Sequence, residues 1–184
     1  MSIEQLAERI PAYAKDLKLN LGSVLRQTEL NEQQLWGTAV ACAIAARNND
    51  VTSAVLAEAQ THLSPQSFEA AKSAASIMGM NNVYYRFLHM TDNDKYRTIP
   101  ARLRMNVIRT HGVDHVDFEL WCTAVSAVNN CHACVASHEK TLREKGLSEE
   151  SVLAAVRIAA VIHAVAGVFD AEAATARTAE PVAV

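Results

Sequence analysis

The chain has 184 residues, of which half are hydrophobic and only 5% aromatic, and its formal net charge is −3. This length suits one compact domain over residues 1–184, with a core of closely packed, alanine-rich helices. The absence of a basic cluster with interleaved aromatic residues argues against nucleic-acid binding. The N-terminal stretch MSIEQLAERIPAY is charged and lacks the apolar core of a signal peptide, which predicts a cytoplasmic protein.

Helices are the only regular elements that the pattern of apolar residues indicates. Alanine-rich stretches repeat apolar residues at three- and four-residue spacing, and none alternates as a strand does. Turn-forming residues separate these stretches at 19–22, 47–50, 63–66, 129–130 and 145–148. The segment 88–105 is polar and irregular. We therefore predict an all-α fold in which 88–105 connects two halves.

The two halves carry matching strings. LWGTAVA at 35–41 matches LWCTAVS at 120–126, an offset of 85 residues. HLSPQSFEAA at 62–71 matches GLSEESVLAA at 146–155, an offset of 84. A near-constant offset predicts a duplicated helical bundle whose two units bury each other's apolar faces.

Only the second unit carries residues suited to chemistry. We assign the first repeat to about 20–88 and the second to about 104–175. The second repeat contains two thiols, an imidazole and a carboxylate, at Cys131, Cys134, His138 and Glu119. The corresponding positions of the first repeat hold Ala46, Asn49, Ser53 and Gln34. Because packing alone would need similar residues in both units, we interpret the first repeat as structural and the second as active.

The longest apolar run, VLAAVRIAAVIHAVAGVF at 152–169, has the length of a membrane-spanning helix. Arg157 and His163 inside it argue against a span. We therefore predict no membrane association, and a helix buried in the bundle or in a subunit interface, with His163 on its buried face.

The remaining cysteines and histidines are assigned to packing or to the surface. Cys42 and Cys122 stand alone in apolar stretches, which predicts small buried side chains. Four histidines in or near turns are predicted to be exposed: His62, His89, His111 and His115.

The stretch NNCHACVASHEK at 129–140 places two cysteines three residues apart. The Asn pair that opens it favours a turn, so that a helix begins near Cys131 and runs to Lys145. In the first turn of a helix, unpaired backbone N–H groups and the helix dipole stabilise a thiolate. The spacing puts the sulfur atoms of Cys131 and Cys134 on one face, close enough to bond after a small adjustment. We predict that Cys131, at the helix start, is the more exposed, resolving cysteine.

His138 and Glu119 are predicted to work together beside Cys134. His138 lies one helical turn after Cys134 and leans back toward it, so we predict that it takes the thiol proton. If the preceding helix is antiparallel, Glu119 and His138 stand roughly 16 and 12 Å from the intervening turn, less than one helical turn apart. Glu119 would then orient His138 directly or through water.

Metal binding and simple packing are the alternatives to redox chemistry at these residues. Four ligands for zinc could come from Glu119, Cys131, Cys134 and His138. No second CxxC pair exists to complete an ordinary structural zinc site. We predict neither a bound metal nor a bound cofactor, and we keep a zinc-stabilised helical interaction module as the non-enzyme alternative.

The four residues spell E-x11-C-x2-C-x3-H, which resembles the signature of the alkylhydroperoxidase D-like, or carboxymuconolactone decarboxylase-like, family. Further strings extend the resemblance over almost the whole chain: YAKDLKLNL, QLWGT, IMGMNNVYYR, LRMNVI and FELW. The resemblance implies an all-helical fold with duplicated halves, usually assembled as a homotrimer.

The resemblance also implies a function. The family contains lipoyl-dependent antioxidant reductases for the peroxiredoxin alkyl hydroperoxide reductase C (AhpC), with weak hydroperoxidase activity of their own. Electrons would come from NADH through dihydrolipoamide dehydrogenase and a lipoylated dihydrolipoamide acyltransferase. The family roles fall on Cys134 as the sulfenic acid-forming cysteine, on Cys131 as its disulfide partner and proton donor, and on His138 with Glu119 as a proton relay. Decarboxylation of a ring lactone, known elsewhere in the superfamily, is the enzyme alternative, and the CxxC pair argues against it.

The sequence departs from the family pattern next to the second cysteine. A close family member carries a histidine immediately before that cysteine, whereas this chain has Ala133 there and His132 just after Cys131. Consecutive helical residues point about 100° apart, so His132 need not do the same work. We predict either that His132 is a dispensable exposed residue or that, when protonated, it stabilises the Cys131 thiolate.

Overall fold

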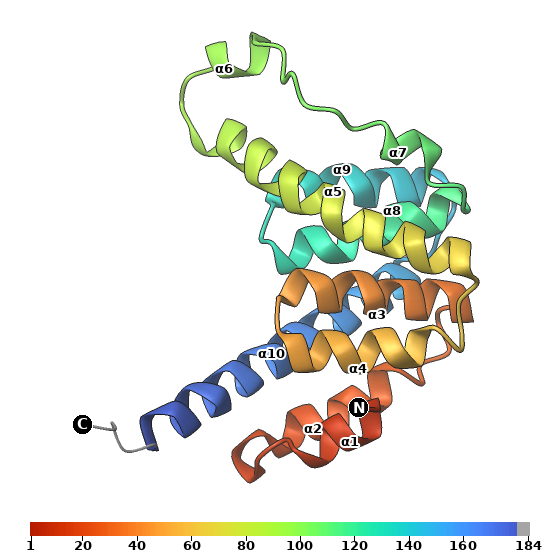
Figure 1. Ribbon diagram of the computed structural model, residues 1–184. Coiled ribbons are helices and arrows are strands. Elements are labelled where there is room, and N and C mark those ends of the chain that lie inside the picture. The colour runs from red at the N-terminus through yellow and green to blue at the C-terminus, as the bar shows by residue number, and fades with distance from the viewer. Residues whose placement is uncertain (180–184) are drawn as a thin grey trace.

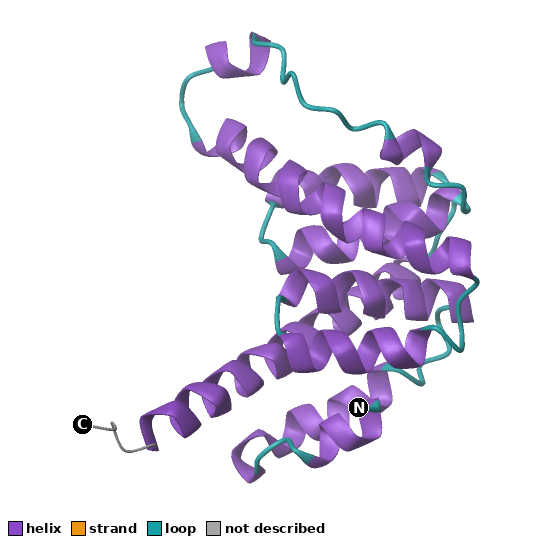
Figure 2. Ribbon diagram, in the orientation of Figure 1, coloured by secondary structure: helices purple, strands orange, loops and turns teal. Residues whose placement is uncertain are grey.

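The computed structural model describes residues 1–179, and within this range the regular elements are helices, with no strand (Figure 2). The all-α prediction is confirmed. The N-terminal segment forms α1 (Ile3–Glu8), the short 3-10 helix η1 (Ala12–Ala14) and α2 (Lys15–Val24). It lies at the end of the bundle that faces away from α8 and α9 (Figure 1).

Six longer helices form the bundle, and they come in two sets of three. The first set is α3 (Glu32–Ala46), α4 (Asn49–Ala59) and α5 (Pro65–Met90). The second set is α8 (His115–Val128), α9 (His132–Glu144) and α10 (Glu149–Ala179). The matching strings begin α5 and α10 and lie within α3 and α8. The internal duplication itself stays a prediction from the sequence.

The helices begin at the capping residues that the sequence contains. Asn31 and Gln34 form a reciprocal capping box at the start of α3. Ser64 accepts a hydrogen bond from a backbone N–H of α5, directly before Pro65. At the start of α10, the Ser148 hydroxyl accepts a hydrogen bond from the Ser151 N–H. Caps of this kind each contribute about 1 kcal/mol, and here they set where the bundle helices start.

The centre of the core is the contact between α3 and α8, which α5 and α10 flank (Figure 1). Gly37 of α3 lies directly against the indole ring of Trp121 on α8, and a Cβ at this position would overlap that ring. The Trp121 Nε1–H donates to the Gln34 carbonyl oxygen at 3.3 Å. This packing explains why the two matching strings differ, with Gly37 in one where the other has Cys122.

The connection between the two sets of helices begins later than predicted. The helix α5 continues to Met90, and the irregular segment with α6 (Lys95–Thr98) and α7 (Val107–Thr110) extends to the start of α8. Figure 1 shows this segment projecting beyond the end of α5 before it returns along the bundle. One face of α5 near Met90 is open to solvent, since Val83, Phe87 and Met90 are all exposed.

The predicted burial of the helix around 152–169 is correct only for part of its surface. By length and composition alone, α10 is the one helix among the described residues that could cross a membrane. Half of the residues in that apolar stretch are buried in the protein, where α10 packs against α2, α3 and α8. His163 is exposed in this chain, so it does not lie in the core, and its alternative place in a subunit interface stays a prediction. Apolar periodicity identified the helix, but His163 lies at surface hollows beside α3, α5 and α8 and not within the packed core.

Candidate active site

A disulfide joins Cys131 and Cys134 at the start of α9, with their Cα atoms 5.3 Å apart. Cys131 is the N-cap residue of α9, and Cys134 is the third residue of the helix. The backbone N–H of Cys134 therefore lies in the first turn, where such groups have no helical acceptor. The predicted helix start and the predicted proximity of the two sulfur atoms are both correct.

The predicted exposure of Cys131 is wrong. Cys131 is fully buried, whereas 6% of Cys134 is exposed. The cause is the turn between α8 and α9, where Asn130 adopts a left-handed backbone conformation with φ of 56°. This turn directs the Cys131 N–H to the Ser126 carbonyl oxygen at 3.0 Å, which draws the residue in against α8. Position at a helix start does not by itself expose a side chain.

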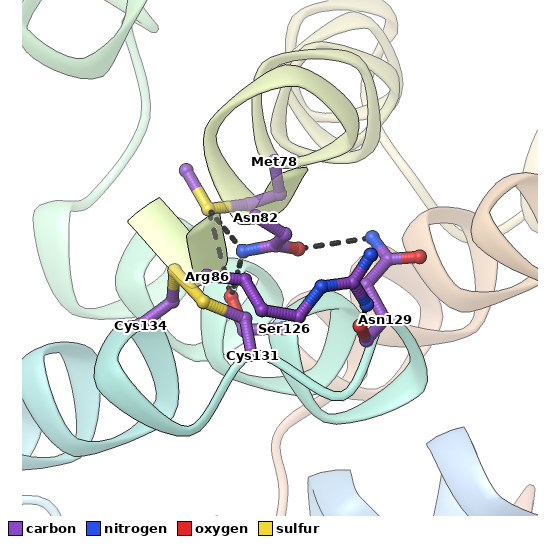
Figure 3. Close-up of a disulfide and its surroundings, with 7 residues drawn as sticks. All are labelled: Met78, Asn82, Arg86, Ser126, Asn129, Cys131 and Cys134. Carbon is purple, nitrogen blue, oxygen red and sulfur yellow. Dashed lines mark hydrogen bonds between the residues drawn. A yellow bond between two sulfur atoms is a disulfide. The ribbon is translucent and has the colours of Figure 1, made fainter. Parts of the chain in front are cut away.

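A buried polar network holds this turn against α5 (Figure 3). The Asn82 side chain donates to the Ser126 hydroxyl oxygen and accepts from the Asn129 amide, each at 2.9 Å. Arg86 donates to the Asn129 carbonyl oxygen at 2.8 Å. Because buried polar groups are costly to leave unpaired, this network fixes the turn that carries the disulfide. Sequence reasoning missed it, although the adjacent Asn81 and Asn82 after the apolar stretch of α5 are a signal for buried polar partners.

Cys134 faces a cavity of about 310 Å³ between α5, α9 and the segment before α8. Its lining residues are Met78, Asn81, Tyr85, His89, Met105, Ile108, Ala133, Cys134, Ser137 and His138. Most of this lining is apolar, and the polar groups come from α5, at Asn81, Tyr85 and His89, and from α9, at Ser137 and His138. An apolar pocket with a few convergent polar groups is the usual form of a small-molecule site.

His138 and Glu119 form a close pair beside this cavity. The His138 Nδ1 atom lies 2.6 Å from the Glu119 Oε2 atom, and the two side chains are 16% and 9% exposed. With the Nδ1–H donated to the carboxylate, the Nε2 nitrogen of a neutral imidazole is the one left to accept a proton. The predicted meeting of α8 and α9 at these two residues is therefore correct, and His138 shares the cavity wall with Cys134.

The structure adds His115 to this group. Its Nε2 atom lies 3.6 Å from the Glu119 Oε1 atom, so that Glu119 has an imidazole on each side. His115 is half-exposed, in agreement with the prediction. The four-residue spacing between His115 and Glu119 on one helix is the sequence signal that would have identified this contact.

His111 is more buried than predicted. Its ring stacks on Phe118 with the ring centres 4.2 Å apart, and it lies 5.9 Å from the His115 ring. Burial, together with the neighbouring His115, lowers the pKa of His111. His62 and His89 are exposed, as predicted.

His132 lies outside the cavity that Cys134 faces. It is the first residue of α9, it is exposed, and it lines a separate shallow surface hollow with Arg86, His89 and Met90. His89 and Ala133 line both hollows, whereas His132 lines only the second. The place of His132 in the chemistry stays a prediction.

The other two thiols are buried, as predicted. Cys42 lies on α3 and Cys122 on α8, and neither forms a disulfide. Burial raises the pKa of both thiols well above the usual range, because a thiolate would lose its hydration there. In the described part of the chain, no group of three or more His, Cys, Asp or Glu side chains is arranged to hold a metal ion.

The fold and this site define an all-helical protein with a CxxC disulfide, in which a histidine–carboxylate pair stands beside the more exposed sulfur. Residues 95–177 match the model of the carboxymuconolactone decarboxylase family. The chain is 64% identical over 173 residues to alkyl hydroperoxide reductase AhpD of Solibacter usitatus, covering 94% of this chain and 98% of that protein. It is 60% identical to the AhpD of Acidobacterium capsulatum, covering 94% of each chain, and 61% identical to that of Gluconacetobacter diazotrophicus, covering 95% and 96%. The chain belongs to the AhpD family of alkyl hydroperoxide reductases.

Proposed function

We propose that this protein is an antioxidant thiol–disulfide oxidoreductase that reduces alkyl hydroperoxides through Cys134 and Cys131. The observation that carries the proposal is the disulfide at a mostly apolar cavity that also contains His138, with Glu119 hydrogen-bonded to that histidine. The names of the relatives, alkyl hydroperoxide reductase AhpD, support the same activity. The apolar cavity wall suits an alkyl chain beside the reactive sulfur.

The oxidative half of the cycle uses the reduced dithiol. His138 takes the proton of the Cys134 thiol, and Glu119 stabilises the imidazolium that forms. The thiolate attacks the hydroperoxide, the O–O bond breaks, and Cys134 becomes a sulfenic acid. The departing alkoxide takes the proton from His138 and leaves as an alcohol. The Cys131 thiol then condenses with the sulfenic acid, which forms the disulfide and releases water.

The reductive half of the cycle uses a dihydrolipoyl group. One thiolate of this dithiol attacks the Cys134 sulfur, which is the one at the cavity, and Cys131 leaves as a thiolate. The second thiol of the lipoyl group then attacks the mixed disulfide, so that the donor becomes a cyclic disulfide and Cys134 is released. The second attack is intramolecular, which favours a dithiol over glutathione.

The wider system is also part of the proposal. A lipoylated dihydrolipoamide acyltransferase, reduced by dihydrolipoamide dehydrogenase, would supply the electrons, and the peroxiredoxin AhpC would receive them. We also propose a cytoplasmic location and a homotrimer. The exposed apolar side chains near the end of α5 are a surface that neighbouring copies could cover, at Val83, Phe87 and Met90. Light scattering of the purified protein tests the assembly.

The central test is peroxide consumption with purified components. We expect turnover of an alkyl hydroperoxide with dihydrolipoamide that far exceeds turnover with glutathione. Cys134→Ser should abolish turnover, whereas Cys42→Ala should retain it, because Cys42 lies in the core away from the cavity. Omitting the acyltransferase, the dehydrogenase or AhpC in turn measures what each contributes. Equal rates with glutathione would contradict the dithiol preference.

The alternatives have their own readouts. A lyase of the lactone-decarboxylating kind would consume its substrate without a change in the thiol count. A zinc-stabilised interaction module would contain stoichiometric zinc, and its Cys131 and Cys134 thiols would be inert toward peroxide. Metal analysis beside a free-thiol count, before and after mild peroxide treatment, separates these possibilities from the oxidoreductase.

A further inference from the structure

The Glu119 carboxylate lies between two histidines that differ in their access to solvent. Its Oε2 atom is 2.6 Å from His138 Nδ1, and its Oε1 atom is 3.6 Å from His115 Nε2. The exposed fraction of the side chain is 16% for His138, 9% for Glu119 and 48% for His115. A line of titratable groups therefore leads from the cavity, through a buried carboxylate, to a half-exposed imidazole at the start of α8.

We propose that His115 is the solvent end of a proton relay that runs through Glu119 and His138 to Cys134. The inference rests on the proposed thiol–disulfide function, and it extends that function to a residue outside the cavity. His115 acts through Glu119 and touches no reacting atom. The gap of 3.6 Å is longer than a hydrogen bond, and a small rotation of the half-exposed ring closes it.

The two half-reactions need such a relay to different extents. When peroxide is reduced, the proton that leaves Cys134 returns to the departing alkoxide, so none has to exchange with solvent. When a dithiol reduces the disulfide, the donor thiols lose their protons outside the site, and Cys131 and Cys134 are released as thiolates. Two protons must then enter a site in which both sulfur atoms are almost fully buried. A route to solvent therefore matters for reduction.

The surroundings of His115 suit proton transfer. An imidazole can take up a proton on one nitrogen and release it from the other near neutral pH. With Nε2 toward Glu119, the Nδ1 atom of His115 is the second site. The nearby His111 has a pKa lowered by burial and by His115, which favours the neutral form of His111.

The other acidic groups of this region are already engaged. Asp114 caps α8 by accepting hydrogen bonds from the backbone N–H groups of Val116 and Asp117. The Asp117 carboxylate accepts from the side-chain amides of Gln33 and Gln34 on α3, at 2.6 and 2.9 Å. Glu119 is thus the carboxylate that joins His115 to the site.

The test measures the two half-reactions separately in weakly buffered solution. Oxidised protein is mixed with dihydrolipoamide, and reduced protein with an alkyl hydroperoxide, for the wild type, His115→Gln and His62→Gln. The last variant is a matched control, because His62 forms a similar pair with Glu32 at 2.6 Å, and neither residue lines the cavity. We expect His115→Gln to slow the reductive half-reaction on the order of tenfold. This effect is smaller than the usual effect of losing a positioned general base, because His115 acts only indirectly. The peroxide half-reaction and the control should be unchanged.

Imidazole buffer supplies the readout that a structural role would not give. A small diffusible imidazole should restore the reductive rate of His115→Gln and leave the wild-type rate unchanged. Equal losses in both half-reactions without rescue would show that His115 only supports the structure, and no loss at all would remove it from the chemistry. If wild-type protein reduces no hydroperoxide, the proposed function fails, and the dithiol half-reaction still reports on His115.

Discussion

The His138 Nδ1 atom and the Glu119 Oε2 atom lie 2.6 Å apart although the two residues come from different helices, α8 and α9, joined by a short turn. Both side chains are largely buried, so solvent screens their interaction only weakly. The pair fixes which imidazole nitrogen is free to accept the thiol proton. It also depends on the turn between these helices, which the Asn82, Ser126 and Asn129 contacts hold in place.

Removal of this pair should impair the chemistry more than the fold. His138→Ala is expected to lower peroxide turnover about a hundredfold or more, the usual scale for loss of a positioned general base. Glu119→Gln keeps a hydrogen-bonding side chain but loses the negative charge, so a smaller loss is expected. Steady-state peroxide assays measure both effects, and circular dichroism checks the fold. A Glu119→Gln protein slower than His138→Ala would show that the carboxylate, not the imidazole, is the base.

The four thiols should differ sharply in reactivity. After reduction of the disulfide, we expect iodoacetamide to label Cys134 first, because its sulfur is at the cavity, and Cys131 more slowly, because it is fully buried. Cys42 and Cys122 should stay unlabelled until the protein unfolds, since burial raises the pKa of both and keeps them in the thiol form.

Mass spectrometry of the labelled protein, with and without urea, reports each site. A mild peroxide treatment should form only the Cys131–Cys134 bond. Labelling of Cys131 ahead of Cys134, or a bond between Cys42 and Cys122, would contradict this assignment.

His132 is expected to matter less than His138. It is exposed and does not line the cavity of Cys134, so His132→Ala should keep most of the peroxide-dependent rate. If a protonated His132 stabilises the Cys131 thiolate, the same variant should slow only the dithiol-dependent half-reaction. Rapid-mixing measurements of the two half-reactions decide between these outcomes. A His132→Ala protein as slow toward peroxide as His138→Ala would mean that the relay has been assigned to the wrong histidine.

Gly37 tests the packing of α3 on α8. A methyl group at this position would overlap the Trp121 ring, so Gly37→Ala is expected to destabilise the protein by about 1–3 kcal/mol or more, as overpacking does. Gly79→Ala is the matched control, because Gly79 is also helical and has open space around its Cβ direction. That variant should be neutral or more stable by up to about 1 kcal/mol.

Urea denaturation of the two variants and the wild type gives the comparison. A Gly37→Ala protein as stable as Gly79→Ala would show that the Trp121 ring can move away without cost. In that case the α3–α8 contact would not be the rigid centre of the bundle.

The sequence by itself determined the features that depend on local signals. The helical class follows from apolar periodicity, and the starts of α3, α5 and α10 follow from their capping residues. The burial of Cys42 and Cys122 follows from their apolar neighbours along the chain. The approach of Cys131 to Cys134, and of Glu119 to His138, follows from helical spacing across a short turn. Each of these needs only residues close in sequence.

The tertiary structure alone decided the exposure of other side chains, namely Cys131, His111 and His163. Cys131 is buried because the left-handed backbone of Asn130 turns the chain toward α5. The residue pattern around Cys131 does not indicate which helix will cover its side chain. His111 is partly covered by its stacking on Phe118, whereas His163, on the apolar helix α10, is exposed at a surface hollow. Exposure depends on which segments pack over a residue. The packing of segments against one another depends on the apolar surface buried over the whole chain. This quantity is non-local, so the spacing of residues within one helix does not predict it.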